Sequence, residues 1–361
     1  MSSQFIRWGI LGTGFIAGEF AKGLRSVPNA QLLGVASRKQ AKAQAFAQIL
    51  GIPRAYESYE QLVNDPDLDV VYVATPNHTH KDLCILALKA GKPVLCEKPF
   101  ALNAQETQEI IQVARSQKLF CMEAMWMRFM PLIQAVKRKI ESGEIGDLKM
   151  LSADFGYPFA YDPDSRFFKP EFGGGALLDR GVYGLSLAYY LFGEPSQIVA
   201  QGAIAPSGVD EQSTILLNYP QGKLATLSQS LCTYSSNQAV IMGTKGKIII
   251  HELFIKPEKI SVSKFSQLTQ SYPSPLIPPN FKQRLVAAAK QNRLIKRGYM
   301  FISSLLVSDQ TTVELITGNG YNYEALEVMN CLKNGQLESE VMPLNETLKI
   351  MEAVDRIRSQ W

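Results

Sequence analysis

The chain has 361 residues, of which 46% are hydrophobic and 19% charged, so its length and composition predict two domains around a large packed core. No apolar run approaches the roughly 20 residues that span a bilayer, and no cleavage site follows the short first apolar segment, so neither a membrane protein nor a secreted one is expected. The net charge of +4 comes from one segment, because residues 259–308 hold eight basic residues and no acidic one, and this argues against nucleic-acid binding.

The cysteines predict a cytoplasmic protein with reduced thiols, because they are odd in number and scattered along the chain. They are Cys84, Cys96, Cys121, Cys232 and Cys331. With only three histidines and no metal-ligand spacing, no metal site is expected.

The first 120 residues alternate short apolar runs with segments of helical periodicity. The apolar runs are residues 7–11, 32–36, 70–74, 94–96 and 119–122. Strands separated by helices predict right-handed crossovers and a parallel, doubly wound sheet, so residues 1–124 are interpreted as a Rossmann-type domain.

The pattern changes near residue 148, where alternating apolar and polar residues separated by turns predict an open, mostly antiparallel sheet. A helix is predicted early in this part, over residues 175–193. We interpret residues 125–320 as an α+β substrate and dimerisation domain, and residues 321–361 as helices that pack back on the body.

A glycine-rich turn joins the first predicted strand to the first predicted helix. It has the form G-x-G-x-x-A: Gly12, Thr13, Gly14, Phe15, Ile16 and Ala17. Gly12 permits a tight turn, Gly14 lets the backbone approach a pyrophosphate, and the helix N-terminus favours the anion. The alternative is an ordinary strand-to-helix turn, but the context predicts dinucleotide binding.

The second predicted strand ends in Ser37, Arg38 and Lys39, with no acidic residue. An acid at this place favours a free ribose 2′-hydroxyl, whereas an arginine accommodates a 2′-phosphate. A hydroxyl and two cations suit a phosphate dianion, so NADP is predicted in preference to NAD. The alternative is a solvated basic turn.

The fourth apolar run leads directly into Glu97, Lys98 and Pro99. The carboxyl ends of parallel strands face the ligand crevice, so Lys98 is expected beside the cofactor, where an ammonium can stabilise negative charge on a substrate oxygen. The alternative is a surface lysine in a loop.

Three motifs together resemble the glucose-fructose oxidoreductase / inositol dehydrogenase (Gfo/Idh/MocA) family: the glycine turn, the Glu97-Lys98-Pro99 tripeptide and "GGGALLDRGVY" at residues 173–183. "EAMWMRFMP" at residues 123–131 is similar to the dihydrodiol dehydrogenase and D-xylose dehydrogenase branch, and the likeness covers nearly the whole chain except about residues 265–312. The resemblance implies a Rossmann domain, an open sheet domain, a homodimer or homotetramer through that sheet, and a small polyhydroxylated substrate.

The resemblance also implies which residues act. It assigns the catalytic role to Lys98, Asp179 and Tyr183, of which the last two share one face of a helix at i, i+4 spacing. A tyrosine beside an ammonium can have its pKa lowered enough to exchange a proton with the substrate, and Asp179 would bind Lys98 or a substrate hydroxyl. Without the resemblance, a capping aspartate and a core tyrosine are the simpler interpretation.

Further cofactor contacts are implied for Thr75, Pro76, Asn77, His80, Glu97, Lys98, Trp126 and Arg128. Further substrate contacts are implied for Lys98, Trp126, Phe155 and Arg166, and the role of Arg180 stays open. On its own, a histidine in a first helical turn is structural more often than functional, and a tryptophan after a strand is usually a packing residue.

Taken together, these patterns predict an NADP-dependent oxidoreductase that moves a hydride between the nicotinamide and a secondary alcohol or ketone, or an aldose C1, of a sugar or cyclic diol. The alternatives are an NAD-linked sugar dehydrogenase and a non-catalytic, cofactor-binding regulator of the same fold. A regulator would be expected to lose Lys98 or Tyr183, and both are present.

The basic segment is predicted to form an amphipathic helix that packs on the sheet domain by its apolar side. Its residues are Lys282, Arg284, Leu285, Val286, Lys290, Arg293, Leu294, Ile295, Lys296 and Arg297. A solvated basic face is favoured over membrane or partner binding.

Overall fold

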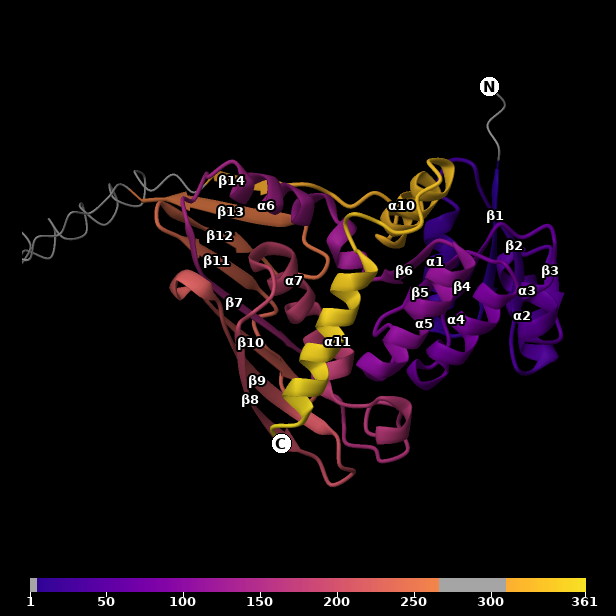
Figure 1. Ribbon diagram of the computed structural model, residues 1–361, viewed down its shortest axis with the longest axis horizontal. Coiled ribbons are helices and arrows are strands. Elements are labelled where there is room, and N and C mark those ends of the chain that lie inside the picture. The colour runs from indigo at the N-terminus through magenta and orange to yellow at the C-terminus, as the bar shows by residue number, and fades with distance from the viewer. Residues whose placement is uncertain (1–4, 266–309) are drawn as a thin grey trace, which may run out of the picture.

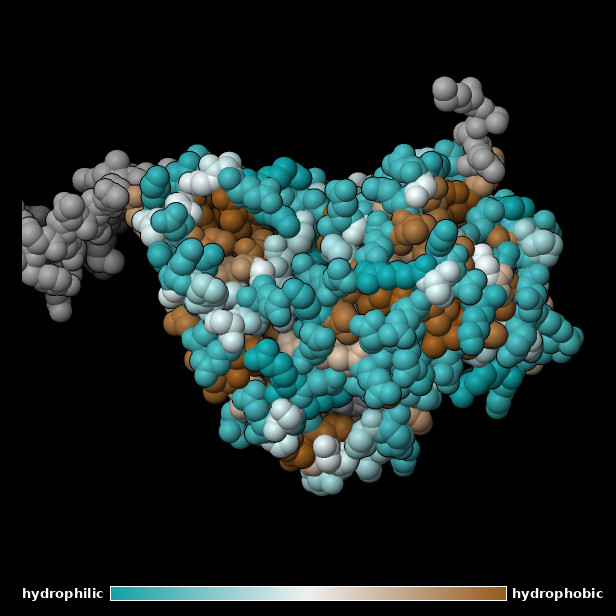
Figure 2. Space-filling model, viewed as in Figure 1, coloured by the Kyte–Doolittle hydropathy of each residue, from teal (hydrophilic) through white to brown (hydrophobic). Residues whose placement is uncertain are grey.

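The computed structural model describes residues 5–265 and 310–361, so the predicted basic helix lies outside the described residues. Figure 1 shows two sheets side by side, with α11 (Leu344–Arg358) running between them. The surface seen from the same direction is mainly hydrophilic, with apolar residues gathered in separate patches (Figure 2). In the part of the chain that is described, no helix combines the length and the apolar character needed to cross a membrane.

The N-terminal lobe is a six-stranded parallel sheet with the strand order β3-β2-β1-β4-β5-β6, which confirms the predicted Rossmann fold. Its elements are β1 (Ile6–Leu11), α1 (Phe15–Leu24), β2 (Ala30–Ala36), α2 (Gln40–Leu50), β3 (Arg54–Tyr56), α3 (Tyr59–Val63), β4 (Val70–Val73), η1 (Asn77–Thr79), α4 (His80–Lys89), β5 (Val94–Glu97), α5 (Ala104–Gln117) and β6 (Cys121–Ala124). β3 and α3 were not predicted, because each is too short to show a periodic pattern.

The central strands β4 and β5 of this lobe are almost entirely apolar because helices cover both faces of the sheet. All four residues of β4 are buried, and the first three residues of β5 are buried and apolar. β5 then ends on Glu97. The only charged side chain of this buried strand therefore stands at its carboxyl end, at the edge where ligands bind in such sheets.

The second lobe is an eight-stranded sheet with the order β14-β13-β12-β11-β7-β10-β9-β8. Its elements are η2 (Trp126–Phe129), α6 (Pro131–Glu141), β7 (Leu148–Gly156), η3 (Pro170–Phe172), η4 (Leu177–Gly181), α7 (Val182–Phe192), β8 (Gln197–Ile204), β9 (Asp210–Asn218), η5 (Pro220–Gly222), β10 (Leu224–Ser230), β11 (Ala239–Gly243), β12 (Gly246–Ile250), β13 (Lys259–Lys264) and β14 (Gln310–Val313). Among its described strands only β7 and β10 pair in parallel, so the mostly antiparallel sheet is confirmed.

One face of the second sheet packs against helices. In β9, Ser213, Ile215 and Leu217 are buried, whereas Gln212 and Thr214 between them are exposed. This alternation has the period of two expected for a sheet covered on one side. The other face is where the resemblance places a homodimer or homotetramer interface, and that assembly stays a prediction.

The C-terminal helices return to both lobes. α10 (Tyr321–Lys333) packs against α1 and η2, and α11 packs against α5, α7 and β8. The main apolar core is therefore continuous, from Trp8 in β1 to Ile357 in α11. This continuity gives the two lobes a defined relative position at the site between them.

Candidate active site

The glycine turn after β1 leaves the N-terminus of α1 open. Gly12 has φ +117°, and a Cβ there would lie 2.3 Å from the carbonyl oxygen of Ala74, so only glycine fits. A Cβ on Gly14 would meet no atom within 4 Å, and Phe15 is 80% exposed. No side chain caps this helix, so its first N–H groups are available to an anion. These features fit the pyrophosphate of a dinucleotide.

The end of β2 lies beside that turn. Ser37 is buried and its hydroxyl accepts a hydrogen bond of 3.4 Å from Thr13, while Arg38 and Lys39 are exposed. The structure therefore presents a hydroxyl and two exposed cations next to the glycine turn, which fits an anionic group on the adenosine side of the cofactor.

The structure encloses the side chain of His80, for which the sequence predicts a cofactor contact. Its side chain is fully buried, with Nδ1 2.9 Å from the carbonyl oxygen of Pro99 and Nε2 2.9 Å from that of Thr75. Burial lowers the pKa of His80. The imidazole braces the turns that follow β4 and β5, and its predicted contact with the cofactor stays a prediction. Asn77 beside it donates to the carbonyl oxygen of Gly173 at 3.4 Å and so joins the lobes.

The turn that carries Lys98 is fixed by two buried carboxyl groups. Glu97 accepts a hydrogen bond from the Tyr72 hydroxyl and another, at 3.2 Å, from the backbone N–H of Lys98. The N–H of Phe100 donates to Glu123 Oε1 at 3.2 Å. Burial raises the pKa values of Glu97 and Glu123 to about 7. The backbone on both sides of Lys98 is thus held in place.

The Lys98 side chain crosses to the second lobe. Its Nζ donates to the backbone carbonyl oxygen of Asp179 at 2.8 Å and lies 3.9 Å from the Asp179 carboxylate. The same ammonium lies 4.7 Å from the ring centroid of Tyr183. The structure therefore brings the three residues assigned to catalysis together, although they come from different lobes.

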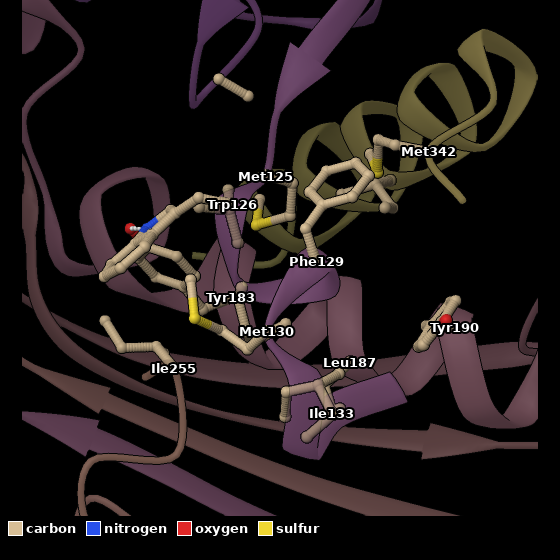
Figure 3. Close-up of a cluster of buried hydrophobic side chains, with 14 of the residues drawn as sticks. Met125, Trp126, Phe129, Met130, Ile133, Tyr183, Leu187, Tyr190, Ile255 and Met342 are labelled. Carbon is tan, nitrogen blue, oxygen red and sulfur yellow. Dashed lines mark hydrogen bonds between the residues drawn. The ribbon is translucent and has the colours of Figure 1, made fainter. Parts of the chain in front are cut away.

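Tyr183 is 5% exposed and lies at the edge of a buried apolar cluster (Figure 3). Its hydroxyl oxygen accepts a hydrogen bond of 2.8 Å from Nε1 of Trp126. Burial raises the pKa of Tyr183 well above its ordinary value. The sequence prediction of a lowered pKa is therefore wrong for this structure, because desolvation, together with the nearby carboxylates, outweighs the hydrogen bond from Trp126.

The segment holding Asp179 is a π-helical turn, η4, and not the first turn of one long α-helix. It is anchored at its start, where Asp210 Oδ2 accepts the N–H of Leu177 at 2.8 Å. A Cβ on Gly175 would lie 2.3 Å from Asp210 Oδ1, and one on Gly174 would lie 2.7 Å from the carbonyl oxygen of Phe167. These glycines admit the close approach of neighbouring protein groups.

Aromatic side chains lie on and near the candidate site, and the sequence analysis identified Trp126 and Phe155 among them. Phe155 meets Tyr183 edge-on, with ring centroids 5.6 Å apart. Phe159 stacks on Phe167 at 4.3 Å, in the loop after β7. Arg166 in that loop is 52% exposed and lies 3.9 Å from Asp179. The dense run of aromatic residues from 155 to 172 was the available signal for this rim.

Two arginines near the site have structural contacts. Arg128 is fully buried, hydrogen-bonds Ser186 at 2.7 Å and pairs with Glu346, and its predicted contact with the cofactor stays a prediction. Arg180 is buried too, and it donates to the carbonyl oxygens of Tyr157 and Ser230. No group of histidine, cysteine, aspartate and glutamate side chains within the described ranges could hold a metal ion.

Both lobes match known family descriptions. Residues 6–125 match the oxidoreductase family with an NAD-binding Rossmann fold, and residues 133–249 match the GFO/IDH/MocA C-terminal domain. The trans-1,2-dihydrobenzene-1,2-diol dehydrogenase of Mus musculus is 34% identical over 98% of this chain and 96% of its own length. The enzyme of the same name from Xenopus laevis is 35% identical over 98% of this chain and 97% of its own.

Solved structures show the same fold at lower identity. A levoglucosan dehydrogenase in complex with NADH and levoglucosan superposes with a TM-score of 0.81 and 20% identity, over 99% of this chain and 97% of that one. A 3-ketoreductase from Actinomadura kijaniata in complex with NADP and TDP-benzene gives a TM-score of 0.77 and 23% identity, over 99% and 98%. With the matches above, the chain belongs to the Gfo/Idh/MocA family of NAD(P)-dependent oxidoreductases.

Proposed function

We propose that this protein is an NADP-preferring oxidoreductase that acts on a secondary alcohol or ketone, or an aldose C1, of a sugar or cyclic diol. The observation that carries this proposal is the convergence of Lys98 with Asp179 and Tyr183 at the carboxyl edge of the Rossmann sheet. Arg38 and Lys39 beside the open N-terminus of α1 support the preference for NADP.

The nicotinamide, when bound, supplies or accepts the hydride. The turn at Gly12 and Gly14 would hold the pyrophosphate of the dinucleotide, and Arg38 would hold the 2′-phosphate of its adenosine ribose. The chain's own residues orient the substrate oxygen and stabilise its charge. Lys98 stabilises negative charge on that oxygen, and the Asp179 carbonyl and carboxylate fix the direction of the ammonium.

Tyr183 acts as the acid in carbonyl reduction and as the base in alcohol oxidation. Trp126 already donates a hydrogen bond to the Tyr183 oxygen, so the tyrosine's own proton is free to point at a substrate. Burial keeps that proton on the phenol, which is the form that reduction needs.

The aromatic rim supports a ring-shaped substrate. Sugars and cyclic diols have apolar ring faces that pack on side chains such as Phe155 and Phe167. Relatives named for a dihydrobenzene diol support a cyclic diol, and the fold match to an enzyme bound to levoglucosan supports a cyclic sugar.

The test is a screen of NADP and NAD reduction across aldoses, inositols and dihydrodiols. We expect NADP-dependent oxidation of at least one class and a loss of at least ~100-fold in turnover for Lys98→Met. Cofactor affinity of this variant should stay close to that of the parent, because the α1 turn and Arg38 supply most of it. Near-parental turnover by Lys98→Met would overturn the proposed mechanism.

A further inference from the structure

Two side chains of α11 grip the backbone that follows Lys98. Arg358 donates from Nη1 to the carbonyl oxygen of Leu102 at 2.8 Å. One turn earlier, Asp355 Oδ2 accepts the N–H of Ala104 at 2.8 Å. Leu102 and Ala104 stand at the end of the loop that begins at Lys98. Two side chains of α11, more than 200 residues away in sequence, therefore hydrogen-bond the backbone of this loop.

The helix that carries Arg358 also contacts the other half of the site, because α11 packs against α7, which continues directly from η4. Burial raises the pKa of Asp210 to about 6, and the positive charge of Arg358 works against this rise. In turn, burial lowers the pKa of Arg358, and the carboxylates of Asp210 and Asp355 work against that. Asp210 is the residue that anchors η4 through the Leu177 N–H, two positions before Asp179. The positive charge of Arg358 therefore favours the ionised form of the residue that anchors η4.

We propose that Arg358 is a positioning residue, which holds the Lys98 loop in register with η4 so that the Lys98 ammonium meets Asp179. The direct link that it protects is the 2.8 Å hydrogen bond from Lys98 Nζ to the Asp179 carbonyl oxygen. The assignment of Arg358 rests on the proposed function only for its effect on turnover.

The physical reason is that Lys98 and Asp179 stand on separate lobes. A displacement of about 1 Å between a catalytic group and its target costs up to roughly 100-fold in rate. Loss of Arg358 removes one hydrogen bond from the Lys98 loop, and it leaves the buried Asp210 without a favourable charge. Both halves should loosen together.

The experiment compares Arg358→Met with Arg356→Met in the full chain. Arg356 lies two positions earlier on the same helix and is exposed, so its replacement controls for lost charge. Hydrogen–deuterium exchange is measured for residues 98–106 and 175–183, together with cofactor affinity, kcat and KM for the best substrate of the screen.

We expect Arg358→Met to speed exchange in both segments and to lower kcat by roughly ten- to hundred-fold, with little change in cofactor affinity. Arg358→Lys keeps the charge and should restore part of kcat. Arg356→Met should behave as the parent protein does in exchange.

The outcomes separate this inference from the proposed function. Exchange in Arg358→Met equal to that in Arg356→Met would overturn the positioning role. Faster exchange in both segments in a protein that oxidises no screened alcohol would support the positioning role and contradict the proposed function. If Arg358→Met does not fold, the exchange of Arg358→Lys decides, and unchanged protection of residues 98–106 in that variant overturns the inference.

Discussion

Replacing Glu123 by glutamine separates its two properties, hydrogen bonding and charge. Glu123 is 2% exposed at the end of β6, and its Oε1 accepts the Phe100 N–H next to the Lys98 turn. Burial raises its pKa from 4.5 to about 7, with the charge of Arg128 and the hydroxyl of Thr347 opposing the rise. Glutamine keeps the acceptor oxygen and cannot ionise.

The sign of the effect follows from the raised pKa. Below its unfolded value the carboxyl group is neutral in both states and has no pH-dependent effect. As the pH rises from about 4.5 to about 7, the unfolded chain ionises while the folded one resists, so folding stability falls. The loss is about 1 kcal/mol at about pH 5 and about 3 kcal/mol at about pH 8, on the scale of 1.36 kcal/mol for each pKa unit.

We therefore expect the free energy of unfolding of Glu123→Gln, measured relative to that of the parent protein, to rise by about 2 kcal/mol between about pH 5 and about pH 8. The measurement is urea unfolding of both proteins at each pH, with Glu352→Gln as a control because Glu352 is exposed on α11. Any constant effect of the new amide cancels in the comparison. If the stability difference between variant and parent stays constant with pH, Glu123 does not titrate as the burial argument requires.

Three further predictions concern the cofactor, the catalytic pair and the core. NADP should bind more tightly than NAD, and Arg38→Ala should reduce the ratio of the two Kd values by roughly ten- to hundred-fold, because a charge-assisted hydrogen bond contributes about 1.5–3 kcal/mol. Equal affinities of the parent protein for the two cofactors would contradict this. Lys98→Met and Tyr183→Phe should each lower turnover at least ~100-fold, and the double variant should be little worse in steady-state kinetics if the pair acts as a unit. Glu324 is fully buried, and neither carboxylate oxygen has a hydrogen-bond partner among the described residues. Glu324→Met should therefore raise the free energy of unfolding by about 1–2 kcal/mol in denaturant titrations, and a lowered free energy of unfolding would show that this carboxyl group has a stabilising partner.

The sequence could predict where functional side chains lie because it shows where the buried strands end. The apolar run before Glu97 and Lys98 is a strand, and its neighbours in the sheet follow the parallel order expected for alternating strands and helices. Topology alone then places Lys98 at the ligand edge. That Asp179 and Tyr183 belong beside Lys98 could not be obtained from spacing and came from the family resemblance.

The sequence could not show which motif residues are enclosed. His80 and Arg128 stand in segments that resemble a cofactor site, yet both are fully buried. The groups that enclose Arg128 come from α7 and the segment before α11, and Val341 is 213 residues away in sequence. A motif gives the type of residue at a position, whereas its accessibility depends on elements that fold against it from elsewhere.

The protonation of Tyr183 follows from burial, and it bears on how one residue serves both directions of the reaction. Lys98 lies over the ring face, and Trp126 donates to the hydroxyl oxygen, so the ammonium does not draw the proton off. The phenol and the ammonium are then two donors suited to a carbonyl oxygen that gains negative charge. Alcohol oxidation needs the phenolate instead, and a second positive charge in addition to that of Lys98 would favour it. If Tyr183 acts as proposed, oxidised nicotinamide would add such a charge and the reduced form would not, so the two cofactor states would favour the base and the acid form of Tyr183 respectively.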